Sequence, residues 1–205
     1  MEKIRMFAQE LSSLKGFIGL CTILFLGSVG FGYTTDTLDA FLLSQTEALR
    51  DTAVRLEQMD NSQLWIFVFI FLNNFIKSVV IVFLGALFGI VPLVFIAMNG
   101  MLIGYVVALA GEAGAGVASI VIRGLLPHGV LEVTAILIAS AYGVKYGALV
   151  SKELAAAVRG RNGDGRGELS RFHNSLKRLV PFLFFALLAA AFIESTVTFY
   201  LVRGI

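Results

Sequence analysis

Long stretches without a charged residue constrain the fold of this chain most. Residues 16–35 carry no charge, and none stands between Lys77 and Glu112. About 20 apolar residues suffice to cross the ~30 Å hydrocarbon layer of a membrane as a helix. Only 15% of the 205 residues are charged, whereas a soluble domain carries about a quarter. The sequence therefore predicts an all-α, polytopic helical membrane bundle that forms a single membrane domain, residues 1–205.

About five membrane-spanning segments are expected, at residues 16–35, 64–90, 93–110, 117–143 and 179–202. The acidic segment 36–61 has apolar residues at helical spacing, which predicts an amphipathic helix outside the hydrocarbon. Residues 145–178 form a basic loop, with two helical arms joined by the glycine-rich tip 160–167.

Two of these segments admit a second interpretation. Residues 64–76 are either the start of a long tilted span or an interfacial helix, in which case the span begins near Ser78. Pro127 interrupts residues 117–143, because proline cannot continue a regular helix. That segment is either a broken span or a re-entrant segment joined to a span. A second broken or re-entrant segment is expected near Asn73 and Asn74.

Basic residues predict the orientation, because loops rich in lysine and arginine remain in the cytoplasm. The N-terminal segment carries Lys3, Arg5 and Lys15, and residues 145–178 carry eight lysines and arginines. Five crossings place both basic segments on one side and the acidic segment on the other. We therefore expect a multi-pass protein of the cell membrane, with the N-terminus cytoplasmic and the C-terminus outside.

A few polar residues interrupt the apolar segments and form the candidate site. His128 and Glu132 share one helical face, whereas Lys77 and Glu194 lie in two other spans. An unpaired charge at mid-bilayer costs about 2.5–3.5 kcal/mol. We therefore expect Lys77 to pair with Glu132 or Glu194, unless each lies near an interface and extends to water. The predicted buried polar cluster is Asn73, Asn74, Lys77, Asn99, His128, Glu132 and Glu194.

Little in the sequence points to catalysis. The spacing of His128 and Glu132 suits zinc, but Glu194 would be needed as a third ligand, because the other histidine, His173, lies in the basic loop. No zinc-protease, hydrolase or phosphate-loop motif occurs. We expect no enzymatic activity, no metal, no cofactor and no nucleic-acid partner.

Small residues four apart predict close helix packing, either within one chain or in a homo-oligomer. The predicted structural residues are Gly85, Gly89, Gly100, Pro127, Gly129 and Gly143. Residues 71–89 also resemble residues 125–143, with the two asparagines opposite Pro127 and His128. This resemblance predicts an internal repeat, which in transporters often frames a site at the membrane midplane.

Several short motifs resemble the stage II sporulation protein M family. They are NN at 73–74, NG at 99–100, LPHG at 126–129 with Glu132 one turn later, and IES at 193–195. The resemblance covers roughly residues 64–205, and more loosely the first span. It implies a polytopic membrane protein of about five spans. The sporulation member works with stage II sporulation proteins D and P, which supply cell-wall degradation during engulfment, and we do not transfer that role.

Two functions remain open. The first is a non-enzymatic membrane scaffold that recruits partners, such as membrane lipids and cell-envelope proteins, in membrane remodelling. The second is a transporter or lipid-translocating protein with a polar path through His128, Glu132, Lys77 and Glu194. A scaffold predicts that the polar cluster is structural, whereas a transporter predicts a water-accessible cavity that reaches it. The resemblance favours the scaffold.

Overall fold

The computed structural model describes residues 2–35, 37–114, 116–160 and 165–198, which contain helices and no strand. Five helical segments in this part of the chain are long and apolar enough to cross a membrane, which confirms the all-α fold with about five spans. They are α2 (Lys15–Thr34), α4 (Ser62–Leu84), α5 (Ile90–Glu112), α7 (Leu126–Val158) with the turns before it, and α8 (Gly165–Ile193).

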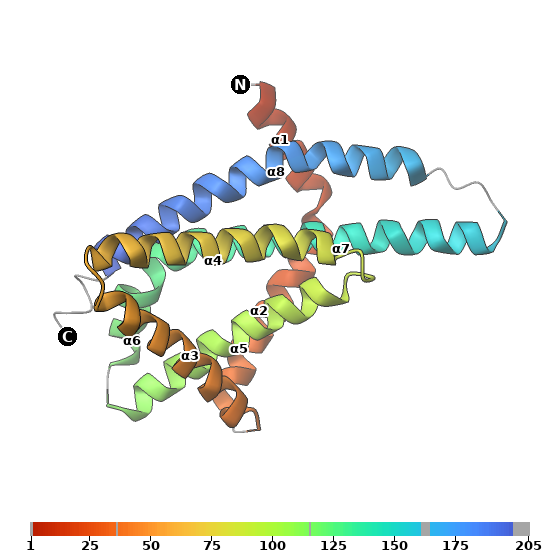
Figure 1. Ribbon diagram of the computed structural model, residues 1–205. Coiled ribbons are helices and arrows are strands. Elements are labelled where there is room, and N and C mark those ends of the chain that lie inside the picture. Colours follow the sequence, from red (N-terminus) through yellow and green to blue (C-terminus); the bar gives the residue numbers. More distant parts are fainter. Residues whose placement is uncertain (1, 36, 115, 161–164, 199–205) are drawn as a thin grey trace.

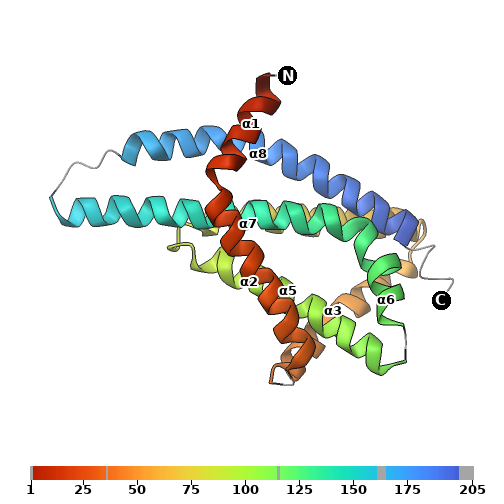
Figure 2. The same cartoon turned by 180° about the vertical axis from the view of Figure 1, so that it is seen from behind.

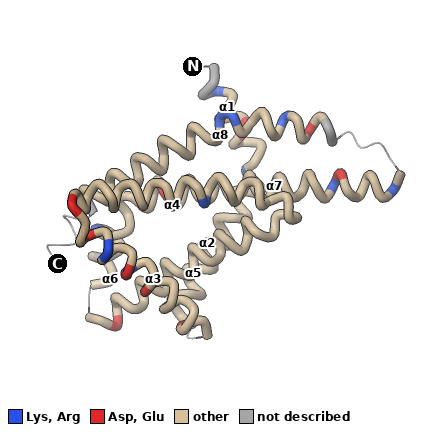
Figure 3. Tube along the Cα trace, viewed as in Figure 1, with Lys and Arg blue, Asp and Glu red and all other residues tan. Residues whose placement is uncertain are grey.

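Three further helices and two π-helical turns complete the described chain. Helix α1 (Glu2–Ser13) precedes the first span, α3 (Asp39–Glu57) follows it, and α6 (Val117–Ser119) leads into the π-helical turn Ile120–Leu125. A second π-helical turn, Glu194–Thr198, extends α8. Figure 3 shows that charged residues gather on α3 and near the far end of α7 and α8, and are sparse elsewhere.

The spanning helices form two groups that cross. In Figure 1 α4 and α7 run side by side with α8 next to them. In Figure 2, the view from behind, α2 crosses in front of α7 and packs along α5. Buried residues of α4, α7 and α8 form the main core, which includes Ile81, Tyr142 and Leu183. A smaller core joins α2, α5 and α7 through Phe25, Ile96 and Ile136.

Large apolar side chains cover the outside of the spans. Ile23 is 74% exposed and Phe185 is 67% exposed. A water-soluble monomer rarely exposes apolar patches of this extent. These side chains instead fit the acyl chains of lipid.

Backbone-to-backbone contacts join α2 to α5, which run in the same direction. A Cβ on Gly100 would lie 2.6 Å from the carbonyl oxygen of Phe25, and one on Gly104 would overlap the carbonyl oxygen of Val29. From the other side, Gly32 lies against the backbone of Met101. Glycine is required at such close approaches because any side chain would force the helices apart.

A second pair of this kind joins the end of α4 to the middle of α7. A Cβ on Gly85 would overlap the carbonyl of Gly143, and one on Gly147 would overlap the backbone of Gly89. The turn between α4 and α5 makes this approach possible, because Phe88 (φ 55°) and Gly89 (φ 74°) adopt left-handed conformations there. The two helices are parallel, since α5 carries the chain back across the bundle between them.

Helices α7 and α8 continue past the end of α4 as a helical hairpin, here called the arm (residues 148–158 and 165–178), which extends to the right in Figure 1. The rings of Tyr146 and Phe172 stack at its base, with centroids 4.9 Å apart. Further out, Lys152 Nζ donates to both carboxylate oxygens of Glu168, at 2.9 and 3.0 Å. The predicted basic loop is therefore mostly helical.

Helix α1 was not predicted, because residues 1–15 were interpreted as an N-terminal tail. It packs across α8, where Phe7 contacts Phe182 at a centroid distance of 5.2 Å. Arg178 Nε donates to Glu10 Oε2 at 3.0 Å, and a second nitrogen of Arg178 pairs with Oε1. This two-pronged ion pair fixes α1 to the base of the arm.

We expect Glu10→Gln and Arg178→Met each to loosen α1 from the arm, because each removes one side of the ion pair. Tryptic cleavage after Arg5, within α1, should become faster in each variant. The double variant should be cleaved no faster than the single ones, since the interaction is already lost. Cleavage rates that multiply in the double variant would show that the two residues act separately.

The structure corrects the sequence interpretation at two places: the turn between the second and third spans, expected between residues 90 and 93, lies between Leu84 and Ile90, and the break near the two asparagines is absent. Helix α4 is continuous from Ser62 to Leu84, so the break expected near Asn73 and Asn74 does not occur, and residues 64–76 are not a separate interfacial helix. The two asparagines have hydrogen-bonding partners within the bundle, described below, and the helix has no reason to open. The break near Pro127 takes the form of a π-helical turn that ends where α7 begins.

Candidate functional site

The start of α7 positions two of the candidate residues. Pro127 is the second residue of the helix, where its missing N–H costs no intrahelical hydrogen bond. His128 and Glu132 follow on one helical face, as expected from their spacing. His128 is only 9% exposed, and Glu132 is half-buried.

The end of α8 brings the third residue to the same place. Glu194 begins the π-helical turn Glu194–Thr198, and its Oε2 lies 4.0 Å from Nε2 of His128. One ligand atom from each of His128, Glu132 and Glu194 lies within 4.8 Å of the other two. Two helix ends far apart in the sequence thus form one cluster, which we call the His–Glu–Glu cluster.

Polar side chains of α4 support this cluster. Asn74 Nδ2 donates to Glu132 Oε1 at 2.9 Å, and Asn73 Nδ2 donates to Asn74 Oδ1 at 3.1 Å. Near the start of the same helix, Gln63 Nε2 donates to the carbonyl oxygen of Ser195 at 3.1 Å. Helix α4 therefore holds both Glu132 and the turn that carries Glu194.

Lys77 and Asn99 lie outside the cluster. Among the described residues, Lys77 is in no ion pair within 4.0 Å, so the predicted pairing with Glu132 or Glu194 is not made. Asn74 takes that place beside Glu132 because it lies nearly one turn earlier on α4. Asn99 donates to the carbonyl oxygen of Phe95 in its own helix, at 2.8 Å.

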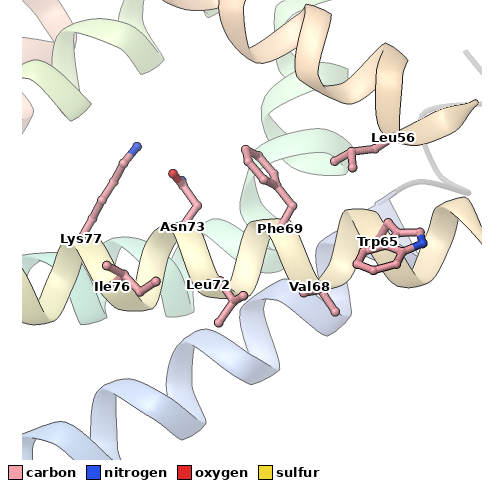
Figure 4. A pocket seen from close by; sticks show the side chains of 8 residues that line it. All are labelled: Leu56, Trp65, Val68, Phe69, Leu72, Asn73, Ile76 and Lys77. Carbon is pink, nitrogen blue, oxygen red and sulfur yellow. The ribbon is translucent and has the colours of Figure 1, made fainter. Parts of the chain in front are cut away.

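Lys77 instead lines an open groove of about 490 Å³ between α4 and the end of α3. Figure 4 shows Lys77, Asn73 and Phe69 pointing to one side of α4, and Leu56 of α3 facing them. The groove is mostly apolar, with Asn73 and Lys77 at one end. Asn73 is thus the residue that connects the groove to the cluster, through Asn74.

The predicted structural residues have different surroundings. Gly85, Gly89, Gly100 and Gly143 lie at the helix contacts described above, and Gly143 also packs 2.5 Å from Pro92 Cγ, measured from an added Cβ. Gly129 differs, because an added Cβ there would meet nothing within 4 Å. The segments 71–84 and 126–143 run parallel in contact, and the internal repeat stays a prediction.

Sequence reasoning missed Gln63 and the ion pair between Glu10 and Arg178. Gln63 gave no signal, because it stands in the polar stretch before α4 and its partner is a backbone carbonyl. Helix α1 could have been predicted, because Phe7, Leu11 and Leu14 recur at helical spacing. This segment served only to predict the orientation of the chain in the membrane.

Comparison with known proteins identifies the family. The family model described as stage II sporulation protein M matches residues 20–199, most of the chain. The chain belongs to this family. The match covers most of α2 and all of α4, α5, α7 and α8, and it includes every residue of the His–Glu–Glu cluster. No curated protein and no solved structure matches the chain. The suspected family is confirmed, and with it a multi-pass membrane protein.

The cluster's chemistry follows from its donors. One imidazole and two carboxyl groups can share protons or ligate a cation, and in a spanning segment such groups are costly unless they are satisfied by partners. Among the described residues, no lysine or arginine lies within 4.0 Å of Glu132 or Glu194. Within 4.0 Å, the basic side chain recorded beside these carboxyl groups in the described part of the chain is His128, next to Glu194.

Proposed function

We propose that this member of the stage II sporulation protein M family is a non-enzymatic scaffold of the cell membrane. The arm presents its surface to partners on the cytoplasmic side. The observation that supports this proposal is the arm itself, in which α7 and α8 continue as one helical hairpin beyond the end of α4. A hairpin that projects from the bundle offers a surface to which partners can bind. A transport path would require only the membrane-spanning helices.

Charge supports this assignment. Lys152, Arg159, Arg171 and Lys177 are exposed on the arm, and the neighbouring Glu168 is already paired with Lys152. Each lysine or arginine near an anionic membrane surface contributes about 1 kcal/mol of attraction. Anionic headgroups and acidic segments of membrane or cell-envelope proteins are thus the partners that the arm suits.

The proposed orientation follows from the same region. The ion pair between Glu10 and Arg178 joins α1 to the base of the arm, so both basic segments lie at one end of the bundle. With the positive-inside rule, that end is cytoplasmic. Five crossings then place the C-terminal end of α8 outside.

A transporter or lipid-translocating protein is the second candidate, favoured by one observation. The His–Glu–Glu cluster connects through Asn74 and Asn73 to the groove that Lys77 lines. Ionisable residues inside spans often mark the path of a substrate or a proton. In this function the cluster would be reached by water, whereas in a scaffold it would not.

Cysteine labelling distinguishes the two functions. In a Cys21→Ser background, Glu132→Cys is treated with a membrane-impermeant maleimide in vesicles of both orientations. A scaffold predicts no labelling from either side, because Glu132 would be reached only through the packed bundle. Labelling from one side would support the transport path instead.

Two control positions calibrate this experiment. Lys152→Cys should react readily, since its side chain is 58% exposed on the arm, and only from the cytoplasmic side. Ser140→Cys, in the same helix, should stay unreactive because Ser140 is fully buried. Reaction of Lys152→Cys from the outside would overturn the proposed orientation.

A further inference from the structure

We infer that His128, Glu132 and Glu194 form a binding site for one divalent transition-metal ion, of which zinc(II) is the best match. The sequence alone argued against such a site, because its third ligand would have to come from a distant helix. The structure brings that residue, Glu194, to within 4.0 Å of His128. This inference is independent of the proposed scaffold function.

The geometry is close to what zinc requires. Zinc binds imidazole nitrogen at about 2.0–2.1 Å and carboxylate oxygen at about 2.0–2.2 Å in tetrahedral geometry, so two ligand atoms on one ion lie roughly 3.3–3.6 Å apart. The three ligand atoms here all lie within 4.8 Å of one another. A side-chain movement of about 1 Å brings them onto one ion, which is within the reach of a carboxylate rotating about its own torsions.

Hydrogen bonds from α4 orient two of the three proposed ligand residues. Asn74 holds Oε1 of Glu132 at 2.9 Å and leaves Oε2 for an ion. Asn73 in turn donates to Asn74, and Gln63 fixes the turn that carries Glu194 through the carbonyl of Ser195. Such outer hydrogen bonds orient metal ligands and strengthen binding.

Charge and donor type select the class of ion. Two carboxyl groups beside each other in a spanning region repel when ionised, and a dication neutralises both. The imidazole favours zinc and its transition-metal neighbours over magnesium and calcium, which prefer all-oxygen sites. The single cysteine, Cys21, lies in α2 and is not among the cluster's ligand residues. Three protein ligands leave a fourth position for water or another ligand.

The test is metal binding by the purified full chain in detergent, with any affinity tag removed. We expect about one zinc ion per chain by equilibrium dialysis with elemental analysis. His128→Gln and Glu194→Gln should each weaken zinc binding by more than the roughly 10- to 100-fold that loss of an outer hydrogen-bonding partner costs, because each removes a ligand. Magnesium in excess should not displace the zinc.

The chain offers matched controls, since it has only two histidines. His173→Gln, on the exposed side of the arm, and Glu112→Gln, at the exposed end of α5, should bind zinc as the wild type does. Cobalt(II) gives a second readout, because its visible absorption reports the ligands and should change in His128→Gln but not in His173→Gln.

Thermal unfolding distinguishes a variant that has lost the metal site from one that has failed to fold. Zinc should raise the unfolding temperature of the wild type and of His173→Gln, but not that of Glu194→Gln, provided that each elutes as the same folded species without metal. The inference is overturned if the wild type binds zinc only at millimolar concentration. It is equally overturned if binding follows His173 and not His128.

Discussion

Replacing Gly147 by alanine should destabilise the protein by about 3 kcal/mol, at the upper end of the cost of overpacking. A Cβ at this position would overlap the backbone of Phe88 and Gly89, which cannot move aside as a flexible side chain could. The α4–α5 turn would have to shift away from α7, with loss of the contacts around Gly85 and Gly143. Reversible unfolding in mixed micelles, or the midpoint of thermal unfolding, measures the effect.

Gly129 provides the control within the same helix. An added Cβ there meets nothing within 4 Å, so Gly129→Ala should leave stability unchanged or raise it by up to about 1 kcal/mol. If both variants lose stability to the same extent, the close approach of α4 to α7 does not contribute in the way described.

Asn74→Leu should cost about 2–3 kcal/mol, because it leaves a carboxyl oxygen of Glu132 without its hydrogen-bond donor inside the bundle. Combining it with Glu132→Met should recover most of that loss. An apolar pair of similar size needs no hydrogen bond, so the two changes together are nearly neutral. The same unfolding measurement applies to all three variants.

Asn99 serves as the matched asparagine. Its amide donates to the carbonyl oxygen of Phe95 within α5 and to no other helix among the described residues, so Asn99→Leu should have a smaller effect than Asn74→Leu. Losses that simply add in the Asn74→Leu, Glu132→Met double variant would mean that the two side chains are energetically independent. The stability of the contact between α4 and α7 would then come from the close approach at its glycines, without a contribution from this hydrogen bond.

Much of the fold could be predicted because lipid imposes simple requirements on length and polarity. The charge-free run 16–35 corresponds to α2, whereas the turn between α4 and α5 falls at residues 85–89 and not between residues 90 and 93 as expected. Continuity of α4 was harder to predict. Asparagines inside a span suggest a break unless their partners are known, and the partner of Asn74 is 58 residues away.

The sequence predicted which residues belong to the candidate site better than it predicted which of them contact one another. Apolar surroundings single out His128, Glu132 and Glu194, since ionisable residues are rare in spans. Which of them meet depends on the rotation of each helix about its axis. Lys77 and Asn74 are three residues apart on α4, and that small difference in angle sends one to the groove and the other to Glu132.

The long pair of α7 and α8 links the two ends of the molecule mechanically. Helix α7 carries His128 in its first turn and Lys152 near its other end, and at 1.5 Å per residue its 33 residues measure about 50 Å. Helix α8 begins on the arm and ends beside Glu194. We therefore expect a displacement of the arm to be transmitted along both helices and to alter the spacing between Glu132 and Glu194, unless α8 bends at Pro181 and absorbs the movement.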